Sequence, residues 1–153
     1  MPFARDNGGM ISTGLARELR DAGLTWAPVS GDVFQLAPDA GPGADGELEG
    51  DLFTVSDMTI EAHIYSTGTI LGFNGTTEWA LDSVAIEDAL WIPREDQLRD
   101  RLQGTFRALD RVDGGSVEYR VRVERAGRER VFASDDPAEA YGLALLDLIR
   151  ASA

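Results

Sequence analysis

The 153-residue sequence contains no cysteine, no lysine and a single histidine. The lack of cysteine excludes disulfides, thiolate metal sites and thiol nucleophiles. The lack of lysine removes the side chain that reaches the β- and γ-phosphates in a nucleotide-binding P-loop, and no glycine-rich stretch has the spacing of that loop. Disulfide scaffolds, cysteine-dependent enzymes and P-loop nucleotide hydrolases are therefore excluded.

Long apolar runs are missing as well. No stretch approaches the roughly 18 to 20 apolar residues that cross a bilayer, and the start of the chain lacks the charged-then-apolar pattern of a secretory signal. We therefore expect a cytoplasmic protein with no membrane partner.

The charge is strongly negative and unevenly distributed. All 14 basic residues are arginine, as is typical of a GC-rich bacterial genome, and 27 acidic residues give a net charge of −13. Residues 1–90 carry 3 arginines and 15 acids, whereas residues 91–153 carry 11 and 12. A net charge of this sign repels phosphate backbones and anionic membranes, so the sequence argues against a nucleic-acid partner.

Composition and pattern together predict an α+β fold. The chain is 43% hydrophobic and 27% charged, as in globular proteins, so we expect one domain over residues 11–153 after a flexible leader at 1–10. An N-terminal helix should begin at Ser12 or Thr13 and end at Gly23. A middle helix should begin near Pro93, and a C-terminal helix at Asp136, with Glu139 reaching back to complete a capping box. The apolar face of the C-terminal helix, which we expect to pack on the sheet, consists of Tyr141, Ala144, Leu145, Leu148 and Ile149.

Runs of β-branched and aromatic residues predict an antiparallel sheet of about five to seven strands with the three helices packed on it. Residues 24–36 fit a short edge strand or two. Asn74-Gly75 predicts a two-residue hairpin that pairs 70–73 with 76–79. The other predicted strands are 52–55, 58–65, 78–84, 105–112, 116–123 and 129–133.

The stretch 37–51 combines proline, glycine and acidic residues and predicts an exposed acidic loop. Its carboxylates either dock a basic protein partner or only keep the surface solvated. The candidate docking residues are Asp45, Glu47, Glu49 and Asp51.

A second candidate site surrounds the only histidine, His63. Glu61 shares its strand face and could join it in acid–base work, or His63 could be an ordinary strand residue. Trp79 and Trp91, with Asp82, could form a stacking platform for a small ligand, or an acidic rim around core tryptophans. We predict no catalytic residue, no metal site and no cofactor, because no serine has a nucleophile-elbow context and no calcium-loop spacing is present.

From Leu98 onward the predicted order is helix, three strands, helix, which is also the order of the double-stranded RNA-binding domain. The basic helix start of that family is replaced here by Ser134-Asp135-Asp136, so RNA binding is disfavoured. The usable basic stripe consists of Arg120, Arg122, Arg125, Arg128 and Arg130.

Two segments, Gly72 to Val84 (GFNGTTEWALDSV) and Ala89 to Leu98 (ALWIPREDQL), carry a resemblance. Through them the chain resembles a group of short actinobacterial proteins, some of which carry the label of a pilus assembly protein. The resemblance covers about residues 10–149 and implies a standalone bacterial protein, without assigning any catalytic residue.

The sequence therefore predicts a non-enzymatic interaction or adaptor protein in a bacterial cytoplasm, with a protein partner that could be basic. The alternative is a small-ligand-binding or weakly catalytic pocket lined by tryptophans and carboxylates. A deep cleft that joins those side chains would favour the pocket, and a filled core with an exposed apolar patch would favour the interaction protein.

Overall fold

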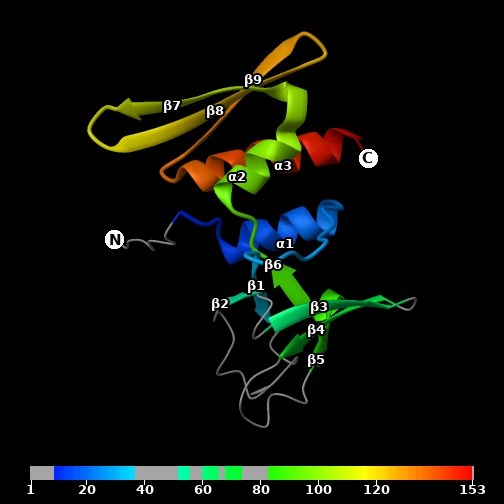
Figure 1. The fold of residues 1–153 in the computed structure, drawn as a ribbon. Helices are drawn as coiled ribbons and strands as arrows, with labels where there is room; N and C mark the ends of the chain where they lie inside the picture. Colours follow the sequence, from blue (N-terminus) through cyan, green and yellow to red (C-terminus); the bar gives the residue numbers. More distant parts are fainter. Residues whose placement is uncertain (1–8, 37–51, 56–59, 66–67, 74–82, 153) are drawn as a thin grey trace. The chain divides into compact units, whose positions relative to one another are not determined.

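The computed structural model describes residues 9–36, 52–55, 60–65, 68–73 and 83–152 (Figure 1). The leader predicted at 1–10 lies outside them except for its last two residues, and so does the acidic loop predicted at 37–51. The contacts of the chain divide it into two compact units. Unit 1 comprises Met1–Leu24 and Pro93–Ala153, and unit 2 comprises Thr25–Ile92. The α+β class is confirmed, and no helix in the described ranges is long and apolar enough to cross a membrane.

Unit 1 contains the three α-helices of the described residues. Helix α1 (Thr13–Ala22) begins as predicted at Ser12, whose hydroxyl accepts a hydrogen bond from the Leu15 N–H at 3.2 Å. It ends at Gly23, whose φ of +123° glycine adopts without strain. Helix α2 (Glu95–Leu102) begins where the Gln97 side chain accepts a hydrogen bond from the Arg94 N–H at 2.9 Å.

Helix α3 (Pro137–Ser152) begins as predicted, because the Asp136 carboxylate accepts a hydrogen bond from the Ala138 N–H at 2.8 Å. The other half of the predicted capping box is wrong. The Glu139 carboxylate accepts hydrogen bonds from the Ser12 N–H at 2.9 Å and the Ser12 hydroxyl at 3.1 Å, while the Asp136 N–H donates to the Ser134 hydroxyl. Glu139 therefore joins the starts of α1 and α3, because it bonds to the distant Ser12 and not to the N–H of the nearby Asp136.

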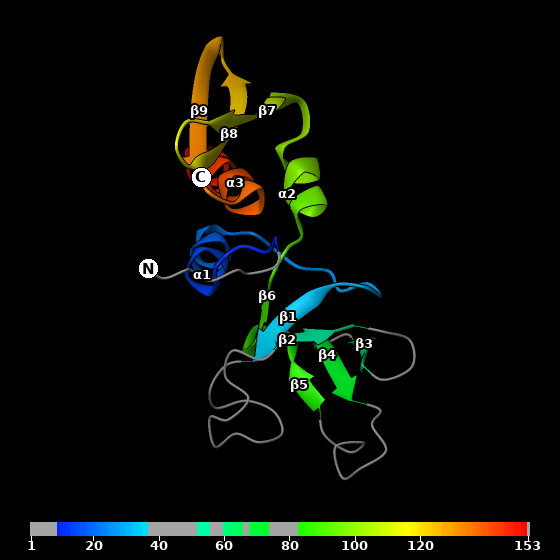
Figure 2. The same ribbon diagram turned by 90° about the vertical axis from the view of Figure 1, so that its left-hand side faces the viewer.

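The sheet of unit 1 has the antiparallel order β7-β8-β9. Its strands are β7 (Phe106–Asp113), β8 (Val117–Arg125) and β9 (Arg128–Ser134), close to the predicted positions, and the short 3₁₀ turn η3 (Gln103–Thr105) leads into β7. Val121 and Val123 are buried on one face of β8, and this inner face lies over α3 in both views (Figures 1 and 2).

Helix α3 is the centre of unit 1, with the sheet on one side of it and α1 on the other (Figure 2). Tyr141 and Leu145 are buried as predicted, and the Tyr141 ring lies 5.6 Å from that of Phe106. Burial extends beyond the predicted apolar face to Ala138, Ala140, Gly142 and Leu146, whereas Leu148 and Ile149 are half-buried. The buried face is wider than predicted because α1 and α2 pack against α3 in addition to the sheet.

Gly142 permits the close approach of α1 to α3. A Cβ atom at this position would lie 2.6 Å from Leu15 Cδ2 and 3.3 Å from Ile11 Cγ2, inside van der Waals contact. Since Ile11 and Leu15 are both buried, neither can move aside without disturbing the packed core.

Unit 2 contains two further three-stranded antiparallel sheets. In the first, the order is β2-β1-β6, and in the second it is β3-β4-β5. The strands are β1 (Val33–Leu36), β2 (Leu52–Thr54), β3 (Ile60–Tyr65), β4 (Gly68–Phe73), β5 (Ser83–Ala85) and β6 (Ala89–Trp91), with the 3₁₀ turn η2 (Ile86–Asp88) before β6.

The prediction of a single sheet is wrong, because the described strands form three separate sheets. The strand expected at an edge within 24–36 is β1, and it lies at the centre of its sheet, between β2 and β6. The predicted partner of 70–73, the strand 76–79, lies outside the described residues; β4 pairs with β3 on one side and with β5 on the other, where Leu71 lies opposite Val84. Alternation marks which residues form strands, whereas pairing depends on packing between distant segments.

Shortening a buried side chain of α3 tests the central place of this helix in unit 1. Leu145 is 2% exposed, so Leu145→Ala should lower the free energy of unfolding by about 2–5 kcal/mol. The half-buried Leu148→Ala is the matched control and should lower it less. Urea unfolding followed by circular dichroism at a helix wavelength reports on unit 1, which holds the described α-helices. Equal losses in both variants would contradict this packing.

Candidate functional site

Most of the site residues predicted from the sequence lie outside the described residues. This applies to the docking residues Asp45, Glu47, Glu49 and Asp51 and to two pocket residues, Trp79 and Asp82. His63 lies in β3 opposite Ile70 of β4, and its backbone alone is described. Both predicted sites therefore stay predictions.

Trp91 is the predicted pocket residue whose side chain is described. It lies in β6 with 8% of its surface exposed, and its ring stacks on Trp26 at 6.1 Å with an interplanar angle of 8°. Phe34 lies 5.7 Å from Trp26 and 5.6 Å from Phe53. Trp91 thus belongs to a four-ring aromatic cluster in unit 2, and one face of its indole is covered by Trp26.

Asp32 is a buried carboxylate that the sequence analysis missed. It is 1% exposed, and its Oδ2 accepts hydrogen bonds from Trp26 Nε1 at 2.9 Å and from the Val29 N–H at 3.1 Å. Its backbone carbonyl accepts from the Val55 N–H at 2.8 Å. Asp32 therefore ties the turn before β1 to the aromatic cluster. The signal in the sequence was Pro28 followed by Ser30-Gly31-Asp32, a turn in which aspartate commonly bonds nearby N–H groups.

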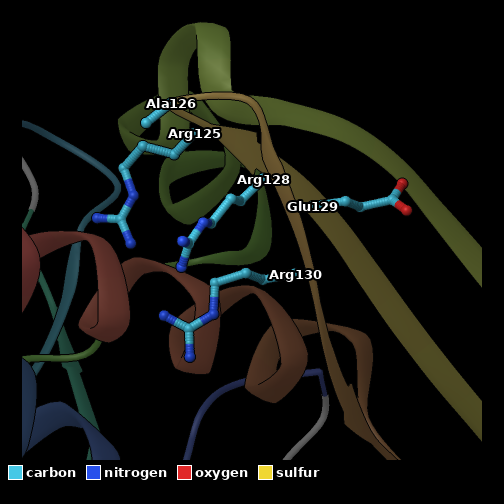
Figure 3. A pocket seen from close by; sticks show the side chains of 5 residues that line it. All are labelled: Arg125, Ala126, Arg128, Glu129 and Arg130. Carbon is cyan, nitrogen blue, oxygen red and sulfur yellow. The ribbon is translucent and has the colours of Figure 1, made fainter.

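A surface hollow of about 910 Å³ lies at the β8–β9 hairpin of unit 1. Its lining residues are Arg125, Ala126, Arg128, Glu129 and Arg130. The guanidinium groups of Arg125, Arg128 and Arg130 point to the same side, toward α3, whereas Glu129 points away (Figure 3). We call these three side chains the arginine cluster.

The hairpin turn forces two members of the cluster to face each other. Ala126 and Gly127 have φ values of +54° and +78°, as in the two-residue turns that match strand twist. Arg125 is therefore the cross-strand neighbour of Arg128. Like charges directly opposite destabilise a sheet, and alanine is rarely found at positive φ. Two locally unfavourable features thus coincide at the hollow.

Asp147 of α3 is the carboxylate beside the arginine cluster. Its oxygens lie 2.9 and 3.0 Å from Nη1 of Arg130 and 3.5 Å from Nη2 of Arg125. The Arg130 guanidinium also lies 5.8 Å from the centre of the Phe132 ring. Within the described ranges, no carboxylate oxygen lies within 4.0 Å of the Arg128 guanidinium. The cluster therefore has three positive charges and one negative charge.

The basic stripe predicted on β8 and β9 divides between the two faces of the sheet. Strand alternation puts Arg120 and Arg122 on the outer face and Arg125 on the inner one. On the outer face, Arg120 pairs with Glu118, and Arg122 lies 3.7 Å from Asp110 and 3.3 Å from Glu129. These two arginines are neutralised, in contrast to the cluster.

The cross-strand pairing of Arg125 with Arg128 could have been predicted from the sequence, because Ala126-Gly127 between them forms a two-residue turn. Asp147 could not have been found in this way, because α3 brings it to the hairpin from a distant part of the chain.

The described residues show little that resembles a catalytic centre. No group of three or more histidine, cysteine, aspartate or glutamate side chains among them could hold a metal ion. Burial raises the pKa of the Tyr141 hydroxyl, and the nearby Arg99 guanidinium offsets part of that rise. Tyr141 is 1% exposed in the core of unit 1, so this shift reflects packing.

No family model, curated protein or solved structure matches the chain. The resemblance to short actinobacterial proteins therefore stays a prediction, and the site rests on its own geometry.

Removal of the Asp32 carboxylate tests its role in unit 2. In Asp32→Ala the Trp26 and Val29 N–H groups lose their acceptor, which should lower the free energy of unfolding by about 1–3 kcal/mol. The exposed Asp88→Ala in the same unit is the control. All three tryptophans lie in unit 2, so urea unfolding followed by tryptophan fluorescence reports on this unit. A midpoint equal to that of the control would refute the structural role of Asp32.

Proposed function

We propose that the chain is a non-enzymatic interaction protein of the bacterial cytoplasm, and that unit 2 docks a cationic protein partner. The observation that supports this is the charge of the two units. Unit 2 (Thr25–Ile92) contains 12 of the 27 acidic residues and none of the 14 arginines. The other 15 acids and all the arginines belong to unit 1, so the structural division coincides with a division of charge.

The ion pairs that each unit can form follow from this division of charge. In unit 1, several exposed acids have arginine partners, such as Glu124 with Arg107 at 3.2 Å and Glu18 with Arg150 at 3.3 Å. In unit 2, no carboxylate can pair with an arginine of its own unit. Asp32 is buried, whereas Glu87 and Asp88 are exposed in η2. A segment that is rich in acids and has no arginine of its own attracts a cationic partner at long range and raises its association rate.

The alternative function is a small-ligand pocket lined by Trp79, Asp82, Trp91 and His63. Trp91 stacks on Trp26 and is only 8% exposed, which favours the interaction protein, because a platform for a ligand needs an open ring face. A protein partner needs no such opening.

A kinetic experiment tests this function with a lysine-rich peptide as the probe. Association with wild-type protein should slow by about tenfold or more between 0.1 and 1 M salt, because the screening length falls from about 10 Å to about 3 Å. A fourfold variant should associate more slowly at low salt. Its melting temperature should stay nearly unchanged, because the sequence predicts that these charges lie in an exposed loop and exposed charges contribute little to stability. Its substitutions are Asp45→Asn, Glu47→Gln, Glu49→Gln and Asp51→Asn.

The matched control removes four exposed acids from unit 1 and so changes the net charge equally. Its substitutions are Asp21→Asn, Asp100→Asn, Asp113→Asn and Asp135→Asn. Association of this control should stay close to the wild-type rate. A salt-independent rate, or equal slowing by both fourfold variants, would end the proposal for unit 2.

A further inference from the structure

The arginine cluster belongs to unit 1, and its charge has the opposite sign to that of the acid-rich unit 2. Arg125, Arg128 and Arg130 face one open hollow of about 910 Å³. We propose that this hollow binds the phosphoryl group of a soluble phosphate monoester. The site stands on the geometry of the β8–β9 hairpin and is independent of the function proposed for unit 2.

The charge at the hollow supports a dianion. Three guanidinium groups and the Asp147 carboxylate leave an excess of two positive charges. Glu129 does not reduce this excess, because its carboxylate points to the other face and lies 3.3 Å from Arg122. A phosphate monoester carries a charge of about −1.5 to −2 near neutral pH, which matches the excess.

Two of the three donors, Arg125 and Arg130, are fixed in position and still reach solvent. The Arg130 guanidinium is held between the Asp147 carboxylate and the Phe132 ring, yet 52% of its side chain is exposed. Arg125 is 32% exposed and shares Asp147 with Arg130. Asp147 thus holds two guanidinium groups side by side, while the Arg128 guanidinium is left for an external anion. Fixed donors lose little side-chain entropy when a ligand binds.

The local energetics also point to a ligand. Arg125 and Arg128 are direct cross-strand neighbours, and this like-charge pair lowers the stability of the hairpin in the absence of an anion. Elsewhere in the same sheet the arginines have carboxylate partners, as Arg120 and Arg122 do. A bound dianion would turn the repulsion between Arg125 and Arg128 into attraction for a shared group.

A phosphoryl group fits better than a carboxylate. Its three terminal oxygens can accept hydrogen bonds from several guanidinium groups at once, and arginine forms paired hydrogen bonds with phosphate. A carboxylate has two oxygens and one charge, and Asp147 already supplies such a group.

A small molecule fits better than a nucleic acid. The cluster occupies one hairpin end in a chain of net charge −13, and on the outer face of the same sheet Glu118 and Glu129 already pair with Arg120 and Arg122. A polyanion that spans several phosphates would meet these acids, whereas a single dianionic group meets only the cluster.

The test is a titration of the isotope-labelled full chain, followed by NMR, with phenyl phosphate as the monoester. Backbone amides of residues 125–130 and the arginine Nε–H signals should shift. The affinity should exceed that for dimethyl phosphate or acetate by about tenfold or more, since both of these carry a single charge.

Two variants locate the site. Arg128→Gln should weaken phenyl phosphate binding by about tenfold or more, because a charge-assisted donor is lost. Arg120→Gln is the matched control: it removes the same charge from the outer face of the adjacent strand and should bind as the wild type does.

Equal binding by wild type and Arg128→Gln would overturn the proposal. It would also be overturned if Arg120→Gln weakened binding as much as Arg128→Gln, since the effect would then come from net charge alone. Binding of an oligonucleotide, or of vesicles containing phosphatidic acid, in place of phenyl phosphate would contradict a soluble monoester as the ligand.

Discussion

The burial of α3 by α1, by α2 and by the sheet is the constraint on which unit 1 depends. Because Gly142 has no side chain, Leu15 of α1 can pack directly on the helix. The first turn of α3 supplies Glu139, which holds Ser12 at the start of α1. At its half-buried edge, the same helix presents Asp147 to the hairpin. The placement of α3 therefore determines both the packing of the core and the arrangement of the arginine cluster.

Features that depend on local chemistry could be predicted from the sequence, and features that depend on distant partners could not. The caps at Ser12, Gly23 and Asp136 satisfy backbone groups within a few residues, so their types and spacing were sufficient. The period-two pattern likewise located β8. The partner of Glu139 and the grouping of strands into three sheets arise from contacts between remote segments, which no local pattern encodes. For the same reason the arginine stripe could be identified, but Asp147 could not.

The two units have complementary chemistry. Unit 2 has twelve acids and no arginine, which suits a cationic partner, while unit 1 has an arginine cluster with an excess of two positive charges. The acidity of the chain contributes to selectivity at this cluster as well, because long-range repulsion acts on polyanions more strongly than on a small dianion. If the hollow binds a phosphoryl group as we propose, a net charge of −13 disfavours nucleic acid and still permits one small dianion at the cluster.

Native-state hydrogen exchange tests the central place of α3 most directly. If α3 is the core of unit 1, the amides of residues 140–146 should exchange only when the whole unit unfolds, with one common free energy. Amides at the tip of the β8–β9 hairpin should exchange much faster, because this segment is exposed. Exchange of the α3 amides at the rate of the hairpin tip would contradict the account.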